Sequence, residues 1–196
     1  MTASMTVYPK AKSDILAFVE KESGQRVRRC FQCAKCTSGC PTAYAMDLTP
    51  RQVMRAVQLG MEEELVRSTS IWLCLSCKTC TIRCPVDIDV SRVIGAVRLR
   101  ATNQGIKPSQ PTVAAFHRIF LSGIRQAGRV SEFILGARHN LETGKLFANA
   151  GLLPALMGRG KLPLVPLYIK GVSEVQAIFQ RVAEAEAEER GQEAHR

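Results

Sequence analysis

The chain has 196 residues, of which 46% are hydrophobic and 22% charged, and its formal net charge is +10. This is the composition of a globular protein, and a basic balance favours nucleic acid, an anionic membrane surface or an acidic protein as a partner. No stretch is apolar enough for a secretory signal or a transmembrane helix, so we expect a cytoplasmic protein; peripheral association with a membrane stays open.

The first predicted element is a short helix over residues 13–24, with Ser13 at its start and a glycine at its end. A second helix is predicted to begin at Thr49. At this point Thr49, Pro50 and Gln52 supply the cap, the first-turn proline and the capping-box partner. A run of three glutamates at 62–64 predicts a further helical turn.

Later in the chain, apolar residues recur at helical spacing over 90–101, which predicts a one-faced helix. Two more helices are predicted, from Pro111 onward and over 131–141. We expect residues 151–171 to form an extended arm rich in proline and glycine. A capping box at Ser173 predicts a last helix with a frayed end. No run alternates as a strand would, so the predicted fold class is all-α.

Two segments of the chain carry the same cysteine pattern. Residues 30–41 read CFQCAKCTSGCP and residues 74–85 read CLSCKTCTIRCP, and together they hold all eight cysteines. In a reducing compartment eight cysteines favour metal over disulfides. The helices that follow the two segments also correspond, if the first copy carries about four extra residues in its loop. The sequence therefore contains a duplicated metal-binding unit.

The spacing Cys-x2-Cys-x2-Cys-x3-Cys-Pro is that of two-cluster ferredoxins, in which the fourth cysteine binds the cluster of the other segment. It predicts two 4Fe–4S clusters. Cluster I takes Cys30, Cys33, Cys36 and Cys84, and cluster II takes Cys74, Cys77, Cys80 and Cys40. Two zinc sites remain an alternative, but zinc modules usually show separated Cys-x2-Cys pairs. Disulfides are disfavoured. Each oxidised cluster with its thiolates adds about −2, which lowers the effective charge to roughly +6.

Other side chains near the segments have less specific readings. Basic residues beside the cysteines either offset the cluster charge, dock a partner or are simply solvated: Arg28, Arg29, Lys35, Lys78 and Arg83. Hydroxyls within the segments are candidates for hydrogen bonds to cluster sulfurs: Thr37, Ser38, Ser76, Thr79 and Thr81. Trp72 either shields cluster II or packs in the core, and His117 and His139 are read as structural. No nucleophile–base pair or phosphate loop is present, so we predict no catalytic residue.

The stretches RRCFQCAKCTSGCPTAYAMDLTPRQVMRAVQLG and IWLCLSCKTCTIRCPVDIDVSRVIGAVR closely resemble HdrC, the iron–sulfur subunit of heterodisulfide reductase, and its bacterial relatives. The likeness covers about residues 25–105 and continues more weakly beyond. It implies an α-helical ferredoxin domain with two 4Fe–4S clusters over residues 1–105. Residues 106–196 would then be a helical and Pro/Gly-rich extension for subunit docking.

The resemblance also implies a function. The chain would not be an enzyme on its own but an electron-transfer subunit of an oxidoreductase complex, relaying single electrons between a flavin-bearing (HdrA-like) subunit and a catalytic (HdrB-like) subunit. Two alternatives remain. One is the iron–sulfur subunit of another dehydrogenase, of the succinate or glycerol-3-phosphate type. The other is a zinc-stabilised nucleic-acid-binding module, for which the basic residues are scattered and have few aromatic neighbours.

Overall fold

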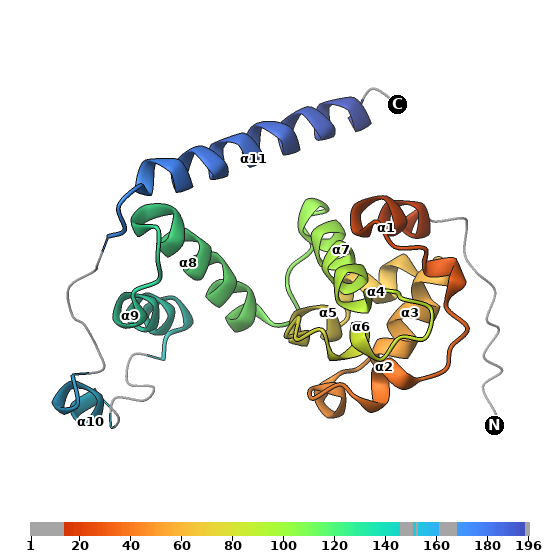
Figure 1. Cartoon of the computed structure of the whole chain (residues 1–196), viewed down its shortest axis with the longest axis horizontal. Helices are drawn as coiled ribbons and strands as arrows, with labels where there is room; N and C mark the ends of the chain where they lie inside the picture. The colour runs from red at the N-terminus through yellow and green to blue at the C-terminus, as the bar shows by residue number, and fades with distance from the viewer. Residues whose placement is uncertain (1–13, 146–150, 152, 161–167, 195–196) are drawn as a thin grey trace. The chain divides into compact units, whose positions relative to one another are not determined.

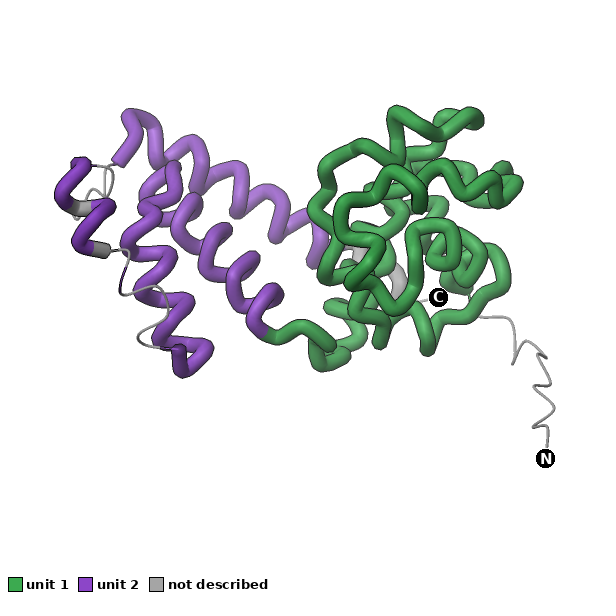
Figure 2. Tube along the Cα trace, turned by 90° about the horizontal axis from the view of Figure 1, so that it is seen from below, with its two compact units in different colours: residues 1–111 green, residues 112–196 purple. Residues whose placement is uncertain are grey.

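The structure is a computed structural model that describes residues 14–145, 151, 153–160 and 168–194. It is built from α-helices with two 3-10 turns, and no strand occurs in the described part (Figure 1). The predicted all-α class is therefore confirmed. The chain divides into two compact units, unit 1 up to Pro111 and unit 2 from Thr112 onward (Figure 2).

The described part of unit 1 contains nine short elements. In chain order they are α1 (Ile15–Ser23), η1 (Val27–Arg29), α2 (Lys35–Ser38), η2 (Ala43–Ala45), α3 (Pro50–Leu59), α4 (Glu62–Arg67), α5 (Ser70–Leu73), α6 (Thr79–Ile82) and α7 (Val90–Asn103). The predicted capping box at the start of α3 is present, since the Thr49 amide donates to Gln52 Oε1 at 2.9 Å. Helices α1 and α3 both end at a glycine in the left-handed region, Gly24 (φ 66°) and Gly60 (φ 70°).

The two cysteine segments occupy equivalent places in unit 1. In each half, a short helix lies inside the segment (α2 or α6) and a longer helix follows it (α3 or α7). Helices α2 and α6 contact each other, α1 packs on α7, and α4 packs on both α3 and α7. The core is made of fully buried aliphatic side chains from these helices, including Val53, Val57, Leu65, Val93 and Val97. Because helices of the first half pack on those of the second, the halves share one core.

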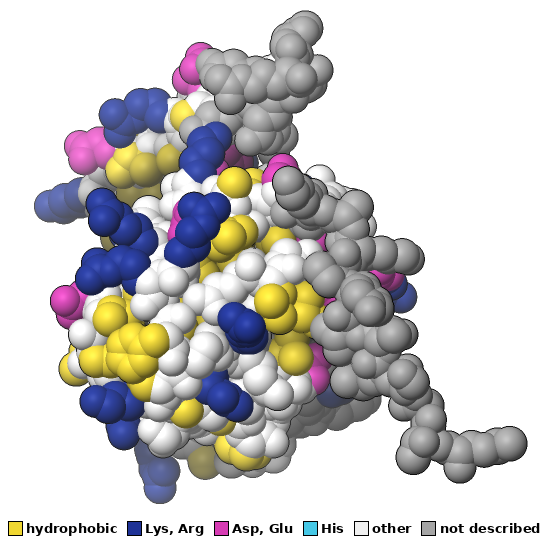
Figure 3. Space-filling view, turned by 90° about the vertical axis from the view of Figure 1, so that its right-hand side faces the viewer, with side chains coloured by type: hydrophobic (Ala, Val, Ile, Leu, Met, Phe, Trp, Pro, Cys, Tyr) yellow, Lys and Arg dark blue, Asp and Glu magenta, His cyan; other side chains and the backbone are white. Residues whose placement is uncertain are grey.

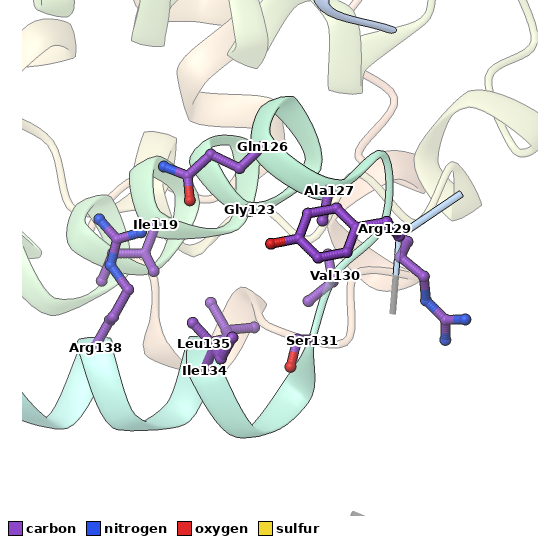
Figure 4. Close-up of a pocket in the computed structure, with 11 residues that line it drawn as sticks. Ile119, Gly123, Gln126, Ala127, Arg129, Val130, Ser131, Ile134, Leu135 and Arg138 are labelled. Carbon is purple, nitrogen blue, oxygen red and sulfur yellow. The ribbon is translucent and has the colours of Figure 1, made fainter. Parts of the chain in front are cut away.

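Unit 2 contains α8 (Pro111–Ala127), α9 (Glu132–Thr143), α10 (Leu153–Gly158) and α11 (Val172–Ala194). Helices α8 and α9 are joined by an Arg118–Glu142 ion pair at 2.7 Å and by a 3.1 Å contact between His139 Nε2 and the Thr112 carbonyl. Between them lies a hollow of about 460 Å³, with apolar side chains such as Ile119, Ile134 and Leu135 on its walls (Figure 4). The structural role predicted for His139 agrees with its position at this contact.

Three predictions for the second half of the chain need correction, and one near the start of the chain falls outside the described residues. The expected extended arm is wrong over 153–158, which form α10; Pro154 is the second residue of this helix, where a proline costs little. Ser173 does not cap α11, because that helix already begins at Val172. The end of α11 is helical to Ala194, as its Ala/Glu-rich composition favours. The predicted Ser13 cap lies outside the described residues.

Among the described helices, none combines the length and the apolar character that crossing a membrane requires.

Candidate metal centres

Two hollows in unit 1 collect the eight cysteines. The first, hollow I, measures about 360 Å³ including space open to solvent, and the cysteines on its wall are Cys30, Cys33, Cys36 and Cys84. The second, hollow II, measures about 340 Å³, and its cysteines are Cys40, Cys74, Cys77 and Cys80. Each hollow thus takes three cysteines from one segment and the last cysteine of the other. This is the grouping that the spacing predicts for two clusters.

The donor set of each hollow fits a multi-iron cluster. Four cysteines surround each hollow and all eight are free thiols. Within the described residues, no three Cys, His, Asp or Glu side chains converge closely enough to hold a single metal ion. Four thiolates around one larger space are the ligand set of a 4Fe–4S cluster.

The backbone of both segments is bent in the same unusual way. In each segment, the two residues that flank the second cysteine have backbones in the left-handed region. They are Gln32 (φ 63°) and Ala34 (φ 66°) around Cys33, and Ser76 (φ 52°) and Lys78 (φ 64°) around Cys77. Such residues are uncommon and tend to gather at functional sites. In this chain they turn each loop around its hollow and lead into the short helices α2 and α6.

The long helices α3 and α7 begin beside the hollows. Arg51 and Met54 of α3 line hollow I, and Ser91 and Ile94 of α7 line hollow II. The first residue of each helix lines the opposite hollow, Pro50 facing hollow II and Val90 facing hollow I. The positive end of a helix dipole favours negative charge nearby, so both helices favour an anionic group in the hollows.

Two aspartates hold the elements around the hollows together. Asp89 caps α7 and also binds the second cysteine segment, through Lys78 Nζ at 2.6 Å and Thr81 Oγ1 at 2.9 Å. Burial acts to raise the pKa of Asp89, but the hydrogen bonds from Lys78, Ser91 and Thr81 prevail and hold the pKa below its usual value.

Asp47 plays a similar part between the two segments. It lies in the loop after the first segment and accepts hydrogen bonds from the Ser68 and Ser70 hydroxyls, each at 2.6 Å, and from the Thr69 amide at 2.9 Å. Although burial opposes the shift, these bonds lower the pKa of Asp47. The loop of the first segment is thereby fixed to the start of α5, which leads into the second.

Each first cysteine is also held by a side chain from the helix that follows its segment. The Gln58 amide donates to the Val27 carbonyl at 3.1 Å and to the Cys30 carbonyl at 2.9 Å. In the second half, the Arg98 guanidinium donates to the Ile71 carbonyl at 2.7 Å and to the Cys74 carbonyl at 3.3 Å. Gln58 and Arg98 thus occupy equivalent positions, but only one of them is charged.

The two halves also touch through Arg83 and Gly39, which directly precede the fourth cysteines. A Cβ atom on Gly39 would come within 2.8 Å of the Arg83 side chain, and Arg83 Nη2 lies 3.4 Å from Ser38 Oγ. The absent side chain of Gly39 therefore leaves room for Arg83 where the segments meet.

Several polar groups lie near cysteine sulfurs. Gln32 Nε2 is 3.4 Å from Cys30 Sγ, the Ile88 amide is 3.3 Å from Cys84 Sγ, and Thr42 Oγ1 is 3.5 Å from Cys40 Sγ. Of the hydroxyls singled out from the sequence, that of Thr79 lies 3.5 Å from Cys77 Sγ.

Two of the other hydroxyls also interact with a cysteine, Thr37 with Cys36 and Thr81 with Cys80, and both interactions act to lower the pKa of the thiol. Thr37 in addition accepts from the Arg51 amide and Thr81 donates to Asp89, whereas Ser38 donates to the Lys35 carbonyl. Sequence reasoning missed Gln32, Thr42 and the Ile88 amide as neighbours of sulfur atoms.

The environment shifts the pKa of three thiols in different directions. Burial raises the pKa of Cys36 and of Cys80, whereas a hydrogen bond with Thr79 lowers that of Cys77. Iron binds the thiolate form of cysteine, so binding of a cluster would deprotonate Cys36 and Cys80 despite their raised pKa values.

The remaining residues singled out from the sequence lie at defined contacts. Arg28 pairs with Glu20 at 3.0 Å, and Lys78 pairs with Asp89. Trp72 is buried in the core, and the Arg98 guanidinium lies 5.7 Å from the centre of its ring. This contact agrees with the packing role considered for Trp72, which does not line hollow II.

Residues 29–89, which contain both segments, match the family model of the 4Fe-4S dicluster domain. The HdrC-type iron–sulfur subunit of the CoB–CoM heterodisulfide reductase of Methanopyrus kandleri is 35% identical over 86 residues, covering 44% of this chain and 45% of the relative. The chain contains a 4Fe-4S dicluster domain and is similar to the HdrC family of heterodisulfide reductase subunits. Its cofactors are two 4Fe–4S clusters.

Two further relatives of this family show how far the similarity extends. The HdrC-type subunit of the H(2):CoB-CoM heterodisulfide,ferredoxin reductase of Methanothermobacter thermautotrophicus is 28% identical over 99 residues, covering 50% of this chain and 54% of the relative. The corresponding C2 subunit of the H(2)/formate:CoB-CoM heterodisulfide,ferredoxin reductase of Methanococcus maripaludis is 29% identical over 163 residues, covering 83% of this chain and 78% of the relative. The chain thus spans about half the length of the first relatives it matches, while the third match reaches into unit 2.

Proposed function

We propose that this chain is the electron-relay subunit of a cytoplasmic heterodisulfide reductase-like complex. In this proposal it passes single electrons between a flavin-bearing subunit and a catalytic subunit and is not an enzyme on its own. When bound, the clusters would supply one-electron redox chemistry, and the cysteines of the chain would hold them without any bond of the chain forming or breaking. The supporting observation is that two hollows, each walled by four cysteines, lie in one small unit.

The proposed ligands are grouped by hollow. Cys30, Cys33, Cys36 and Cys84 would hold cluster I, and Cys74, Cys77, Cys80 and Cys40 would hold cluster II. The helix N-termini of α3 and α7 would stabilise the negative charge of the clusters, and Asp47 and Asp89 would keep the loops in place. We further propose that residues 1–105 act as an α-helical ferredoxin domain and that residues 106–196 dock the chain onto its partners.

Both hollows have an exposed apolar side chain at their edge, which supports contact with partner subunits. Phe31 lines hollow I and is 61% exposed; Leu75 lines hollow II and is 65% exposed. They occupy the same position in the two segments, directly after the first cysteine. Figure 3 shows one face of the molecule, on which Lys and Arg side chains lie among hydrophobic ones. Such a surface suits docking to another protein at each cluster.

Paired alanine variants test the proposed ligand groups. If Cys30 and Cys84 serve one cluster, the variant C30A/C84A loses that cluster alone and keeps about four irons and four sulfides per chain after anaerobic purification. Because Cys74 and Cys84 would serve different clusters, C74A/C84A is expected to lose both. Wild-type protein should hold about eight irons and eight sulfides, with visible absorption that bleaches on reduction.

The opposite pattern, in which C74A/C84A keeps four irons and C30A/C84A keeps none, would mean that each segment closes its own cluster. Stoichiometric zinc without sulfide in the wild-type protein would contradict the relay function altogether. Circular dichroism of both variants shows whether the loss of iron reflects lost ligands or a lost fold.

A further inference from the structure

The two hollows differ in the charge placed on the first cysteine. Gln58 and Arg98 each bridge the carbonyl of a first cysteine and the carbonyl three residues before it. A neutral amide therefore touches Cys30 at hollow I, and a guanidinium touches Cys74 at hollow II. Each directly follows the last valine of its helix, Val57 in α3 and Val97 in α7, so the two halves differ at one equivalent position of the repeat.

No described neighbour neutralises the charge of Arg98, although burial acts to lower the pKa of its guanidinium. It makes no ion pair with any described carboxylate, its side chain is partly buried, and its guanidinium lies over the Trp72 ring. An arginine stays protonated in proteins. A charge held partly away from water acts more strongly on its neighbours than one at the surface.

Other cations near the hollows are either paired with a carboxylate or exposed to solvent, among them Lys35 beside Cys36 and Arg83 beside Cys84. Lys78, near hollow II, is neutralised by Asp89 at 2.6 Å. Arg51 lines hollow I but is exposed, so water screens it. Arg55 donates to Gln58 Oε1 at 3.3 Å, yet it is also exposed and one hydrogen bond further from Cys30.

We propose that Arg98 sets the reduction potential of cluster II above that of cluster I, because Gln58 takes its place at cluster I. Reduction adds one negative charge to a cluster that is already anionic, and a nearby cation stabilises the reduced state more than the oxidised one. An electron shared between the two clusters then resides mainly on cluster II. Arg98 is a positioning residue: it contacts the backbone carbonyl of Cys74, a proposed ligand, and this contact holds its charge beside hollow II. The proposal rests on the proposed function, because it requires both clusters.

The test is an anaerobic redox titration of the full-length protein, followed by visible absorption and electron paramagnetic resonance. Wild-type protein should show two one-electron steps. Arg98→Gln is expected to move the upper step down by about 59 mV, a tenfold fall in the reduced-to-oxidised ratio at fixed potential, and to leave the lower step in place. Gln58→Arg should move the lower step up, and the double variant Q58R/R98Q should exchange the clusters that give the two steps.

Three control variants separate charge from structure. Arg98→Lys keeps the charge and should retain most of the upper step, whereas a role in loop geometry alone predicts that R98K and R98Q behave alike. Arg51→Gln removes a charge from hollow I and should shift the lower step by less than R98Q shifts the upper one. Lys107→Gln removes an exposed charge beyond the end of α7 and should shift neither step.

Three results would overturn the proposal: R98Q leaving both potentials unchanged, R98K shifting the upper step as far as R98Q does, or R51Q having the larger effect. If the wild-type protein held no iron–sulfur cluster, the proposed function itself would fail, and iron and sulfide analysis distinguishes that outcome from the other three.

Discussion

Replacing Asp89 should loosen hollow II selectively, because this carboxylate joins α7 to the second cysteine segment. Its Oδ1 accepts hydrogen bonds from Thr81 Oγ1 (2.9 Å), Ser91 Oγ (2.7 Å) and the Arg92 amide (3.1 Å), while its Oδ2 binds Lys78 Nζ. Asp89→Ala removes all four contacts at once. Asp89→Asn keeps the shape and the acceptor of Oδ1 and removes the ion pair.

The magnitudes follow from the exposure of the groups. Loss of the N-cap costs about 1 kcal/mol. The ion pair contributes at most about 1 kcal/mol, because the Lys78 side chain is 47% exposed. A half-buried Thr81 hydroxyl that loses its partner costs roughly a further 1 kcal/mol. We therefore expect a local destabilisation of about 3 kcal/mol for D89A and about 1 kcal/mol for D89N.

The assay is anaerobic loss of visible absorption in mild denaturant with an iron chelator. If local opening precedes iron release, each 1.4 kcal/mol corresponds to about a tenfold change in rate. The iron at hollow II, about half of the total, should therefore be released some hundredfold faster from D89A than from wild type. Asp87→Asn is the matched control, because Asp87 is exposed, lies two residues away and has a φ of 53° that asparagine tolerates. Equal rates in D89A and wild type, or equal acceleration in D87N and D89N, would refute the reasoning.

Three further outcomes are expected. Leu65→Ala, at a fully buried position of α4, should lower the free energy of unfolding by about 2–5 kcal/mol, whereas Leu59→Ala, 41% exposed, should cost far less; denaturant titration compares them. Because the pKa of Asp47 is lower in the folded state, its stabilisation is fully present above the unfolded pKa of about 3.9 and is lost as pH falls through the folded value. Below about pH 4, where the carboxyl of Asp47 binds a proton in the unfolded state before it does in the folded state, the stability of Asp47→Asn should therefore depend less on pH than that of wild type, and an unchanged slope would contradict this. A chain truncated after Pro111 should keep both clusters but no longer co-purify with its partners, and retained partners would exclude docking by unit 2.

The features predicted best from the sequence depend on strong local chemistry. Cysteine spacing fixes which thiols can share a cluster, and the hollows group the eight cysteines as expected, although iron binding by each cysteine stays a prediction. The start of α3 was predictable because Thr49, Pro50 and Gln52 all favour the same boundary.

Features that depend on contacts distant in sequence were not predictable in the same way. Gln58 and Arg98 bind backbone carbonyls, and residue types do not reveal which carbonyl a side chain will bind. The sequence indicates their equivalence only by position, since Gln58 directly follows MRAV and Arg98 directly follows the matching stretch IGAV. The sequence does not predict helix α10, because proline and glycine usually interrupt helices, although a first-turn proline is compatible with one.

The sharing of cysteines between the hollows has a consequence for biogenesis. Under the proposed ligand groups, a nascent chain that has emerged only as far as the first segment has three of the four thiols for its first cluster, and the last arrives with Cys84. The second cluster is complete only when Cys80 has followed Cys40, so neither ligand group is filled until most of the second segment has left the ribosome. Ribosome-bound chains ending before Cys80 should acquire no stable cluster, which makes iron delivery a late event.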